Sequence, residues 1–151
     1  MTTNVDIRRP TLDDRDEWMR LRRALWPDCD PPTCLEEMRT ILAATDQLAL
    51  LAFVDDRAVG FAEFSIHPHA PGCHTMSVGY LEGWWVDVDH RRTGVGGVLV
   101  RRGEDWARAM GCREMASDTW IENVGSDAAH RALGFEETDR LIHYRRTLES
   151  G

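Results

Sequence analysis

Several features that would place this chain in a common class of proteins are absent from its sequence. It contains no lysine, which excludes the Gly-Lys-Ser/Thr signature of a Walker phosphate loop. Its longest strictly apolar run is Leu48 to Val54, which is far too short to span a bilayer. The first ten residues lack the apolar core of a secretory signal peptide. We therefore expect a cytoplasmic protein that has no membrane partner.

An excess of positive charge is also missing. The sequence has 18 basic side chains against 26 acidic ones, a formal net charge of −8. This balance disfavours nucleic acid as a partner, because its phosphate backbone is a polyanion. It suits a cationic small molecule, although an acidic surface is also ordinary solubilising chemistry.

The four cysteines (Cys29, Cys34, Cys73 and Cys112) form no Cys-x-x-Cys pair. They are typical of reduced thiols in a cytoplasmic protein. Their spacings match no common zinc pattern, even with His74 included, so we expect no metal site.

The length and the 42 % hydrophobic content predict a single domain over residues 1–151. A capping box at Thr11 and Asp14 predicts a helix to Leu25, and Thr33-x-x-Glu36 predicts the start of a second one. The second helix would bury a face made of Leu35, Met38, Ile41 and Leu42. Further helices are expected at 94–110 and 126–133, and strands at 5–9, 48–54, 58–66, 80–86, 114–118 and 141–147.

A glycine-rich segment, Arg91 to Gly97, joins the predicted strand at 80–86 to the following helix. Gly94, Gly96 and Gly97 let the backbone approach an anion closely, and the first helical turn offers free N–H groups. The segment thus predicts a diphosphate site. A dinucleotide fingerprint would need a small residue where Leu99 stands, so that alternative is disfavoured. A flexible turn before a helix is the other interpretation.

The pattern Arg91-x-x-Gly94-x-Gly96 resembles the pyrophosphate loop of the GCN5-related N-acetyltransferases (GNAT), which bind acetyl-CoA. Other segments resemble one branch of that superfamily, the aminoglycoside 6′-N-acetyltransferases. They are Leu25-Trp26-Pro27, Leu81-Glu82-Gly83, Ala116-Ser117-Asp118-Thr119 and the run HRALGFEETDR from His130 to Arg140. The likeness spans roughly residues 21–146.

This resemblance implies a mixed α/β (α+β) fold, with a mostly antiparallel central sheet flanked by helices. It implies a homodimeric enzyme that moves an acetyl group from acetyl-CoA to the 6′-amine of an aminoglycoside, by direct attack and without a metal. Two alternatives stay open: an acetyltransferase of another amine, such as a polyamine or a peptide N-terminus, and an acetyl-CoA-binding sensor without catalysis.

The resemblance also implies a set of cofactor residues. The pantetheine arm of acetyl-CoA would pair with the backbone of the strand that ends in Trp84, Trp85 and Val86, and an N–H near Val86 would face the thioester oxygen. Asn123 would hydrogen-bond the pantetheine. The diphosphate would lie on Arg91, Arg92, Thr93, Gly94, Val95, Gly96 and Gly97.

A polyamine substrate is positively charged, so its binding site needs acidic side chains. Glu82 is placed by alternation on the same strand face as Trp84. Asp118 ends the next strand, so the two carboxylates converge if those strands are neighbours. The resemblance makes both of them amine ligands and bases. It adds Trp26 as a surface for a sugar ring, and His69 and Asp139 as further substrate contacts. His69 departs from the tyrosine that relatives carry.

His130 occupies the position where many acetyltransferases have a tyrosine. An imidazole donates a proton near neutral pH, so His130 is a candidate to protonate the leaving thiolate. A structural hydrogen bond is the alternative role, and the sequence does not decide between the two.

Overall fold

A computed structural model describes residues 4–150 of the chain. A five-stranded sheet with the order β1-β2-β3-β4-β5 forms its centre, antiparallel except for the parallel pair β4–β5. The mixed, mostly antiparallel fold expected from the sequence is thereby confirmed. The elements are β1 (Asp6–Arg8), η1 (Leu12–Asp14), α1 (Arg15–Leu25), α2 (Pro31–Ala43), β2 (Gln47–Val54), β3 (Arg57–His67), β4 (Val78–Val86), η2 (Val88–His90), α3 (Val95–Ala109), β5 (Met115–Ser117) and α4 (Val124–Ala132).

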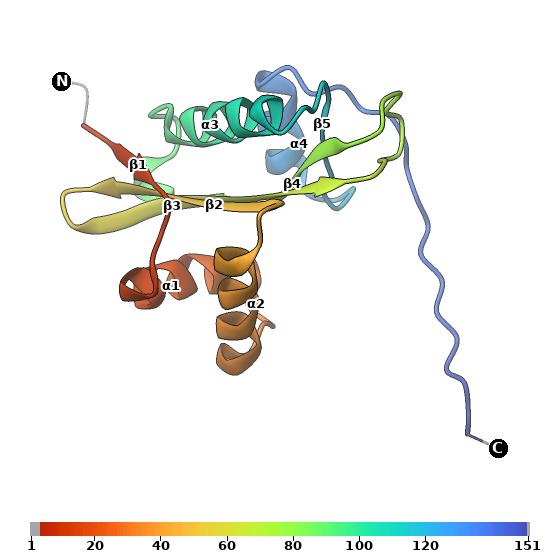
Figure 1. The fold of residues 1–151 in the computed structure, drawn as a ribbon, viewed down its shortest axis with the longest axis horizontal. Coiled ribbons are helices and arrows are strands. Elements are labelled where there is room, and N and C mark those ends of the chain that lie inside the picture. The colour runs from red at the N-terminus through yellow and green to blue at the C-terminus, as the bar shows by residue number, and fades with distance from the viewer. Residues whose placement is uncertain (1–3, 151) are drawn as a thin grey trace.

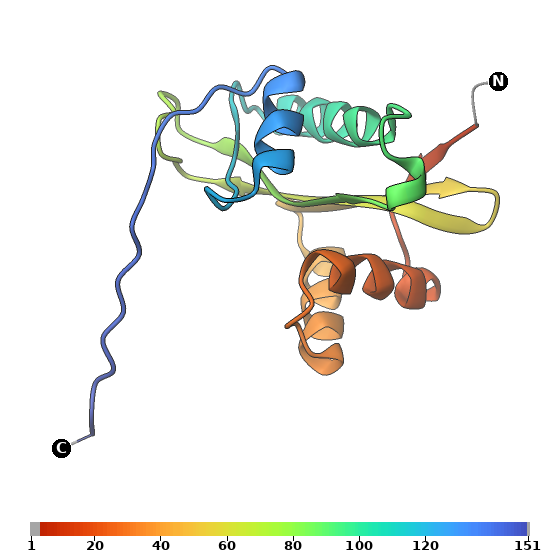
Figure 2. The ribbon, with the colours of Figure 1, turned by 180° about the vertical axis from the view of Figure 1, so that it is seen from behind.

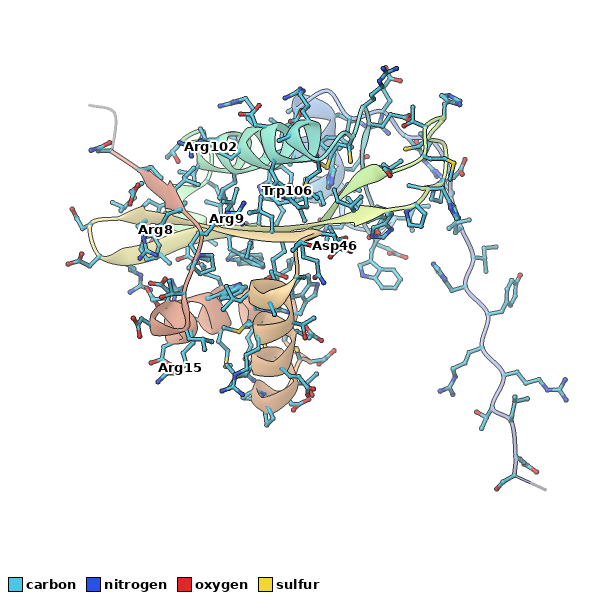
Figure 3. All side chains as sticks on the ribbon, in the orientation of Figure 1. Arg8, Arg9, Arg15, Asp46, Arg102 and Trp106 are labelled. Carbon is cyan, nitrogen blue, oxygen red and sulfur yellow. The ribbon has the colours of Figure 1, made fainter. Side chains whose placement is uncertain are left out.

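The helices form a layer on each face of the sheet (Figure 1). Helices α1 and α2 cover one face, and α3 and α4 cover the other, as the view from behind also shows (Figure 2). Each face has its own apolar cluster. Trp18, Leu21 and Phe61 belong to the α1/α2 side, and Leu81 and Leu99 to the α3 side. Trp106, labelled in Figure 3, packs from α3 against the second cluster. The sheet therefore presents two different environments along the same strands.

The start of helix α2 differs from the prediction. Asp30, not Thr33, is the N-cap, and its carboxylate accepts a hydrogen bond from the Thr33 N–H at 3.2 Å. Two prolines then occupy the first helical turn, where a missing N–H costs no hydrogen bond. The buried residues of this helix are Cys34 and Met38, whereas Leu42 of the predicted face is 39 % exposed. The Thr11 capping box is confirmed, with its first turn tightened into η1.

The strand predicted at Leu141–Thr147 is wrong for the described chain. Residues 135–150 form no regular element and run away from the sheet (Figures 1 and 2). The exposed fractions of Leu141, Ile142, Tyr144 and Leu148 are 66 %, 78 %, 89 % and 84 %. The backbone of this segment is extended, but a strand also needs a neighbour to complete its hydrogen-bond ladder. This segment has no such neighbour within residues 4–150.

None of the helices described is both long enough and apolar enough to cross a membrane.

Candidate active site

A β-bulge in β4 organises the site. Glu63 of β3 pairs with Gly83, and the next residue, Phe64, pairs with Leu81, so Glu82 is the extra residue. The bulge reverses the alternation of side chains along β4. Leu81 and Trp84 contact the α3 cluster, whereas Glu82 lines a cleft on the α1/α2 side. The prediction that Glu82 shares a face with Trp84 is therefore wrong, because simple alternation does not hold across a bulge.

The strands β4 and β5 part at the same place. Their parallel ladder runs from Gly79–Met115 to Leu81–Ser117 and goes no further. From Glu82 to Val86, the edge of β4 that faces away from β3 has no strand beside it within the described residues. Unpaired strand edges bind extended chains through backbone hydrogen bonds. An extended arm such as pantetheine fits this edge.

The acceptor side is an open cleft of about 460 Å³ between α1, α2 and the sheet. Trp26 forms part of its wall. The indole packs edge-on against Phe61, with ring centroids 5.9 Å apart. It also lies so close to Gly83 that a Cβ there would approach Trp26 Cη2 to 2.3 Å. The Trp26-Pro27 and Glu82-Gly83 motifs thus meet in one contact. Acidic side chains in the cleft are Glu36, Glu37, Glu63 and Glu82.

Glu82 is held by two polar residues of β3. Its Oε1 accepts a hydrogen bond of 2.5 Å from Ser65 Oγ and lies 2.6 Å from His67 Nε2. The His67 ring stacks on Tyr80 at 4.3 Å between centroids, and the Tyr80 hydroxyl donates to Asp118. Burial and the carboxylate of Asp118 raise the pKa of Tyr80, so this hydroxyl keeps its proton. The structure brings Glu82 and Asp118 together, linked by two aromatic residues that the sequence analysis did not single out.

A buried ion pair lies below the cleft. The Glu63 carboxylate accepts hydrogen bonds of 2.9 Å from Arg22 Nη1 and from Trp18 Nε1, and Arg22 also pairs with Glu37. Burial raises the pKa of Glu63 to about 7, against the opposing effect of Arg22. An acidic residue inside an otherwise apolar strand, FAEFS, was the signal that could have revealed this pair.

The cofactor side lies on the opposite face, at the start of α3. Gly94 is the N-cap with a φ of 88°, a left-handed conformation that favours glycine. No side chain caps this helix, and no acidic residue lies in its first turn. The free N–H groups there suit a diphosphate. Arg92, exposed and also at positive φ (63°), lies beside them.

The other residues of the glycine-rich segment have mixed surroundings. The Arg91 guanidinium lies 4.6 Å from the Trp85 ring centroid, and its Nε donates to the Val86 carbonyl at 2.9 Å. Thr93 donates its hydroxyl to the His90 carbonyl at 2.5 Å. The side chain of Val95 is buried in the core, which leaves only its backbone for a ligand.

Trp84 and Trp85 point to opposite faces, as their neighbouring positions predict. Trp84 lies under the glycine-rich segment, because a Cβ on Gly96 would approach the indole Cζ2 to 3.0 Å. Trp84 Nε1 is buried without a hydrogen-bond partner in the described structure. Trp85 packs with the α1/α2 cluster and donates to Asp87 at 3.3 Å.

His130 of α4 lies between Trp84 and Phe135, with ring centroids 5.5 Å and 5.3 Å away. Its Nδ1 lies 2.7 Å from the Ser126 carbonyl and must donate there. Its Nε2 lies 2.7 Å from Ser117 Oγ. Both ring nitrogens thus have protein partners, which favours a structural role.

The remaining predicted residues lie in exposed positions. Asn123 caps α4, with its Oδ1 accepting from the Ser126 N–H at 3.0 Å, and its amide nitrogen stays available. His69 lies in the loop after β3. Asp139 lies in the extended segment after α4, and its side chain makes no hydrogen bond or ion pair with other described residues. No cluster of potential metal ligands occurs in the described part of the chain.

The sequence profile of the acetyltransferase (GNAT) family matches residues 15–135. The chain therefore belongs to this family of acetyl-CoA-dependent N-acetyltransferases.

Its relatives place it in a particular branch, the aminoglycoside 6′-N-acetyltransferases. The protein of Stenotrophomonas maltophilia named aminoglycoside N(6′)-acetyltransferase type 1 is 44 % identical over 145 residues, covering 95 % of this chain and 94 % of the relative. A protein of the same name from Serratia marcescens is 41 % identical over 138 residues, covering 90 % and 94 %.

Solved structures of an aminoglycoside 6′-N-acetyltransferase also resemble this chain. AAC(6′)-Iy in complex with CoA has a TM-score of 0.92 and 40 % identity, covering 96 % of both chains. The same enzyme with the bisubstrate analogue CoA-S-monomethyl-acetylneamine has a TM-score of 0.91 and 40 % identity, covering 96 % of this chain and 99 % of that one. The recognition of the family and of its cofactor from the sequence is confirmed.

Proposed function

We propose that the protein transfers the acetyl group of acetyl-CoA to the 6′-amine of aminoglycoside antibiotics and so confers resistance to them. The observation that carries this proposal is the opening between β4 and β5. Glu82, the bulged residue there, lines an acidic cleft on one face of the sheet, and the uncapped start of α3 on the other face packs over Trp84, two residues further along β4. A polycationic acceptor and a diphosphate-bearing donor require these two opposite environments.

Each group has a separate task in this reaction. When bound, acetyl-CoA supplies the thioester that the amine attacks and carries away the thiolate. The first-turn amides of α3 and Arg92 hold the diphosphate. Val86 offers a backbone N–H to the thioester oxygen, and Asn123 an amide to the pantetheine. Glu82 and Asp118 bind the acceptor ammonium and take up its proton, directly or through water. Trp26, His69 and Asp139 complete the acceptor contacts.

We also propose that the protein works in the cytoplasm as a homodimer. All four cysteines are free thiols in the structure, which fits a reducing compartment. The segment 141–148 exposes four large apolar side chains on an extended backbone, while β5 has a strand on one side only within the described residues. In the dimer, the segment 141–148 of one copy pairs with the free edge of β5 in the other copy. The segment thereby gains a neighbouring strand, and β5 gains one on its second side.

Product regiochemistry tests the proposed activity. Tobramycin and acetyl-CoA are incubated with the protein, and mass spectrometry with NMR locates the acetyl group. We expect one acetyl group, on the 6′ nitrogen. Acetylation at another ring amine, or faster turnover of spermidine, would instead support an acetyltransferase of another amine. Tight acetyl-CoA binding without turnover of any amine would support a sensor.

The proposed acceptor residues are tested with isosteric variants. Asp118→Asn and Glu82→Gln should each raise the KM for tobramycin and slow turnover, and should leave the Kd of acetyl-CoA nearly unchanged. Asp105→Asn is the matched control, because Asp105 is an exposed α3 carboxylate paired with Arg108. Equal behaviour of all three variants would place the acceptor site elsewhere.

A further inference from the structure

His67 contacts Glu82, a residue of the acceptor cleft, and has no part in the activity described so far. It is the last residue of β3, and the exposed fraction of its side chain is 37 %. Its Nε2 lies 2.6 Å from Glu82 Oε1 and 3.0 Å from Ser65 Oγ. An imidazole this close to a carboxylate must carry a proton on Nε2 and donate it.

This contact leaves the two oxygens of Glu82 in different states. Oε1 accepts hydrogen bonds from Ser65 and His67, while Oε2 has no hydrogen-bond partner among the described residues. A carboxylate fixed through one oxygen presents the other in a defined direction. The bulge aims this side chain away from the regular alternation of β4, and the contacts with Ser65 and His67 hold it there.

The orientation of His67 is itself fixed. Its ring stacks on Tyr80 at 4.3 Å with an interplanar angle of 14°. Tyr80 in turn donates its hydroxyl to Asp118. The plane of one imidazole is therefore coupled to Glu82 directly and to Asp118 through Tyr80.

We propose that His67 is a positioning residue for acceptor binding, which holds Glu82 Oε1 so that Oε2 is free to receive the substrate ammonium. The inference rests on the proposed function.

Two variants of His67 separate the effect of its hydrogen-bond donor from the effect of its aromatic ring. His67→Gln places an amide N–H near the position of Nε2 without a titratable group, and His67→Phe keeps the stack on Tyr80 without a donor. We expect the KM for tobramycin to rise about tenfold in His67→Phe, because a hydrogen bond to a charged group is lost. His67→Gln should stay near the wild-type KM at pH 7.5. The kcat and the KM for acetyl-CoA should change much less in both variants.

The split between KM and kcat and the rescue of the KM by His67→Gln are the readouts that a purely structural role would not change. His74→Gln and His74→Phe are matched controls on the neighbouring loop, where the side chain is exposed. Thermal melts confirm that each variant folds.

The inference is overturned if His67→Phe binds tobramycin as the wild type does, or if His67→Gln is as impaired as His67→Phe. A rise in the KM for tobramycin in His74→Phe equal to that in His67→Phe would also contradict it. Calorimetric binding of tobramycin to the wild-type protein distinguishes this failure from a failure of the proposed function. Without wild-type binding, the proposed function falls and this inference falls with it.

Discussion

Gly96 leaves the space that the Trp84 indole occupies beneath the start of α3. A Cβ at this position would lie 3.0 Å from Cζ2 and 3.1 Å from Nε1 of the indole. The glycine thus has two reasons to be small: the packing of Trp84 from inside and the approach of a diphosphate from outside. The sequence pattern suggested only the second reason.

Gly96→Val should therefore abolish measurable acetyl-CoA binding, because the branched side chain displaces either Trp84 or the ligand. Isothermal titration calorimetry measures the Kd, and circular dichroism checks that the fold is retained. Gly97→Ala is a milder control, since its Cβ meets the flexible end of Arg101 at 3.2 Å. Unchanged affinity in folded Gly96→Val would remove this segment from the cofactor site.

His130 has a geometry that favours support of the cofactor side over proton donation, because both of its nitrogens have protein partners. We expect His130→Ala to act mainly through a raised KM for acetyl-CoA, since Ser117 and Trp84 lose a neighbour. Steady-state kinetics at saturating acetyl-CoA test this. A fall in kcat of about two to four orders of magnitude with an unchanged KM would instead identify a general acid.

Glu63 makes stability depend on pH in an unusual direction. Burial raises its pKa to about 7 in the folded protein, whereas an unfolded glutamate titrates near its ordinary value. Between those two values the folded state binds more protons than the unfolded state. The free energy of unfolding that this site contributes is therefore greatest at low pH and falls as the pH rises through about 7.

Glu63→Gln removes this titration. Urea denaturation at pH 5 and pH 8 should show that the variant's stability relative to the wild type improves with rising pH, by about 1–3 kcal/mol. Arg22→Lys, which keeps the positive charge, should retain the pH dependence of the wild type. A variant whose relative stability worsens toward pH 8 would mean that Glu63 is ionised in the folded protein.

At the scale of single elements, the sequence predicted most helices and strands and misplaced the features that depend on context. Periodicity gave β2, β3, β4 and α3 to within about two residues. The bulge at Glu82 has no signature in the sequence, because it arises from the pairing of β3 with β4. The link from His67 through Tyr80 to Asp118 joins three segments and was invisible for the same reason.

Helix α2 shows a similar limit. Thr33 and Glu36 have the spacing of a capping box, but Asp30 and the two prolines after it start the helix earlier. Local patterns compete, and the one that satisfies the first backbone N–H groups determines the start.

The N-cap assignment is directly testable. Asp30→Ala should lower the Tm by about 3 °C, because the Thr33 N–H loses its acceptor. Thr33→Ala should change the Tm by less, since its side chain does not cap the helix. Differential scanning fluorimetry compares the two, and a larger effect from Thr33→Ala would restore the predicted start at Thr33.

At the scale of the whole molecule, the segment after α4 runs away from the sheet instead of packing against it. Thr138 contacts the β3–β4 loop through the Pro71 carbonyl, and the chain then leaves the fold. Monomeric proteins rarely expose apolar side chains in a contiguous row, and such rows mark interaction sites. We therefore propose that the segment 141–148 pairs with another copy of the chain.

If the protein is the homodimer proposed above, removal of residues 141–151 should convert it into a monomer, because it deletes the apolar side chains that a second copy would cover. Size-exclusion chromatography with light scattering gives the mass of each species. A chain that ends after Leu148 is the matched control and should remain dimeric, since it keeps all four exposed apolar residues of the segment. A cysteine introduced at Ile142 and another at Met115 should cross-link two copies under oxidation if the segment pairs beside the partner's β5. A truncated protein that keeps the mass of the full chain would show that another surface holds the dimer, and a monomeric full chain would end the homodimer proposal.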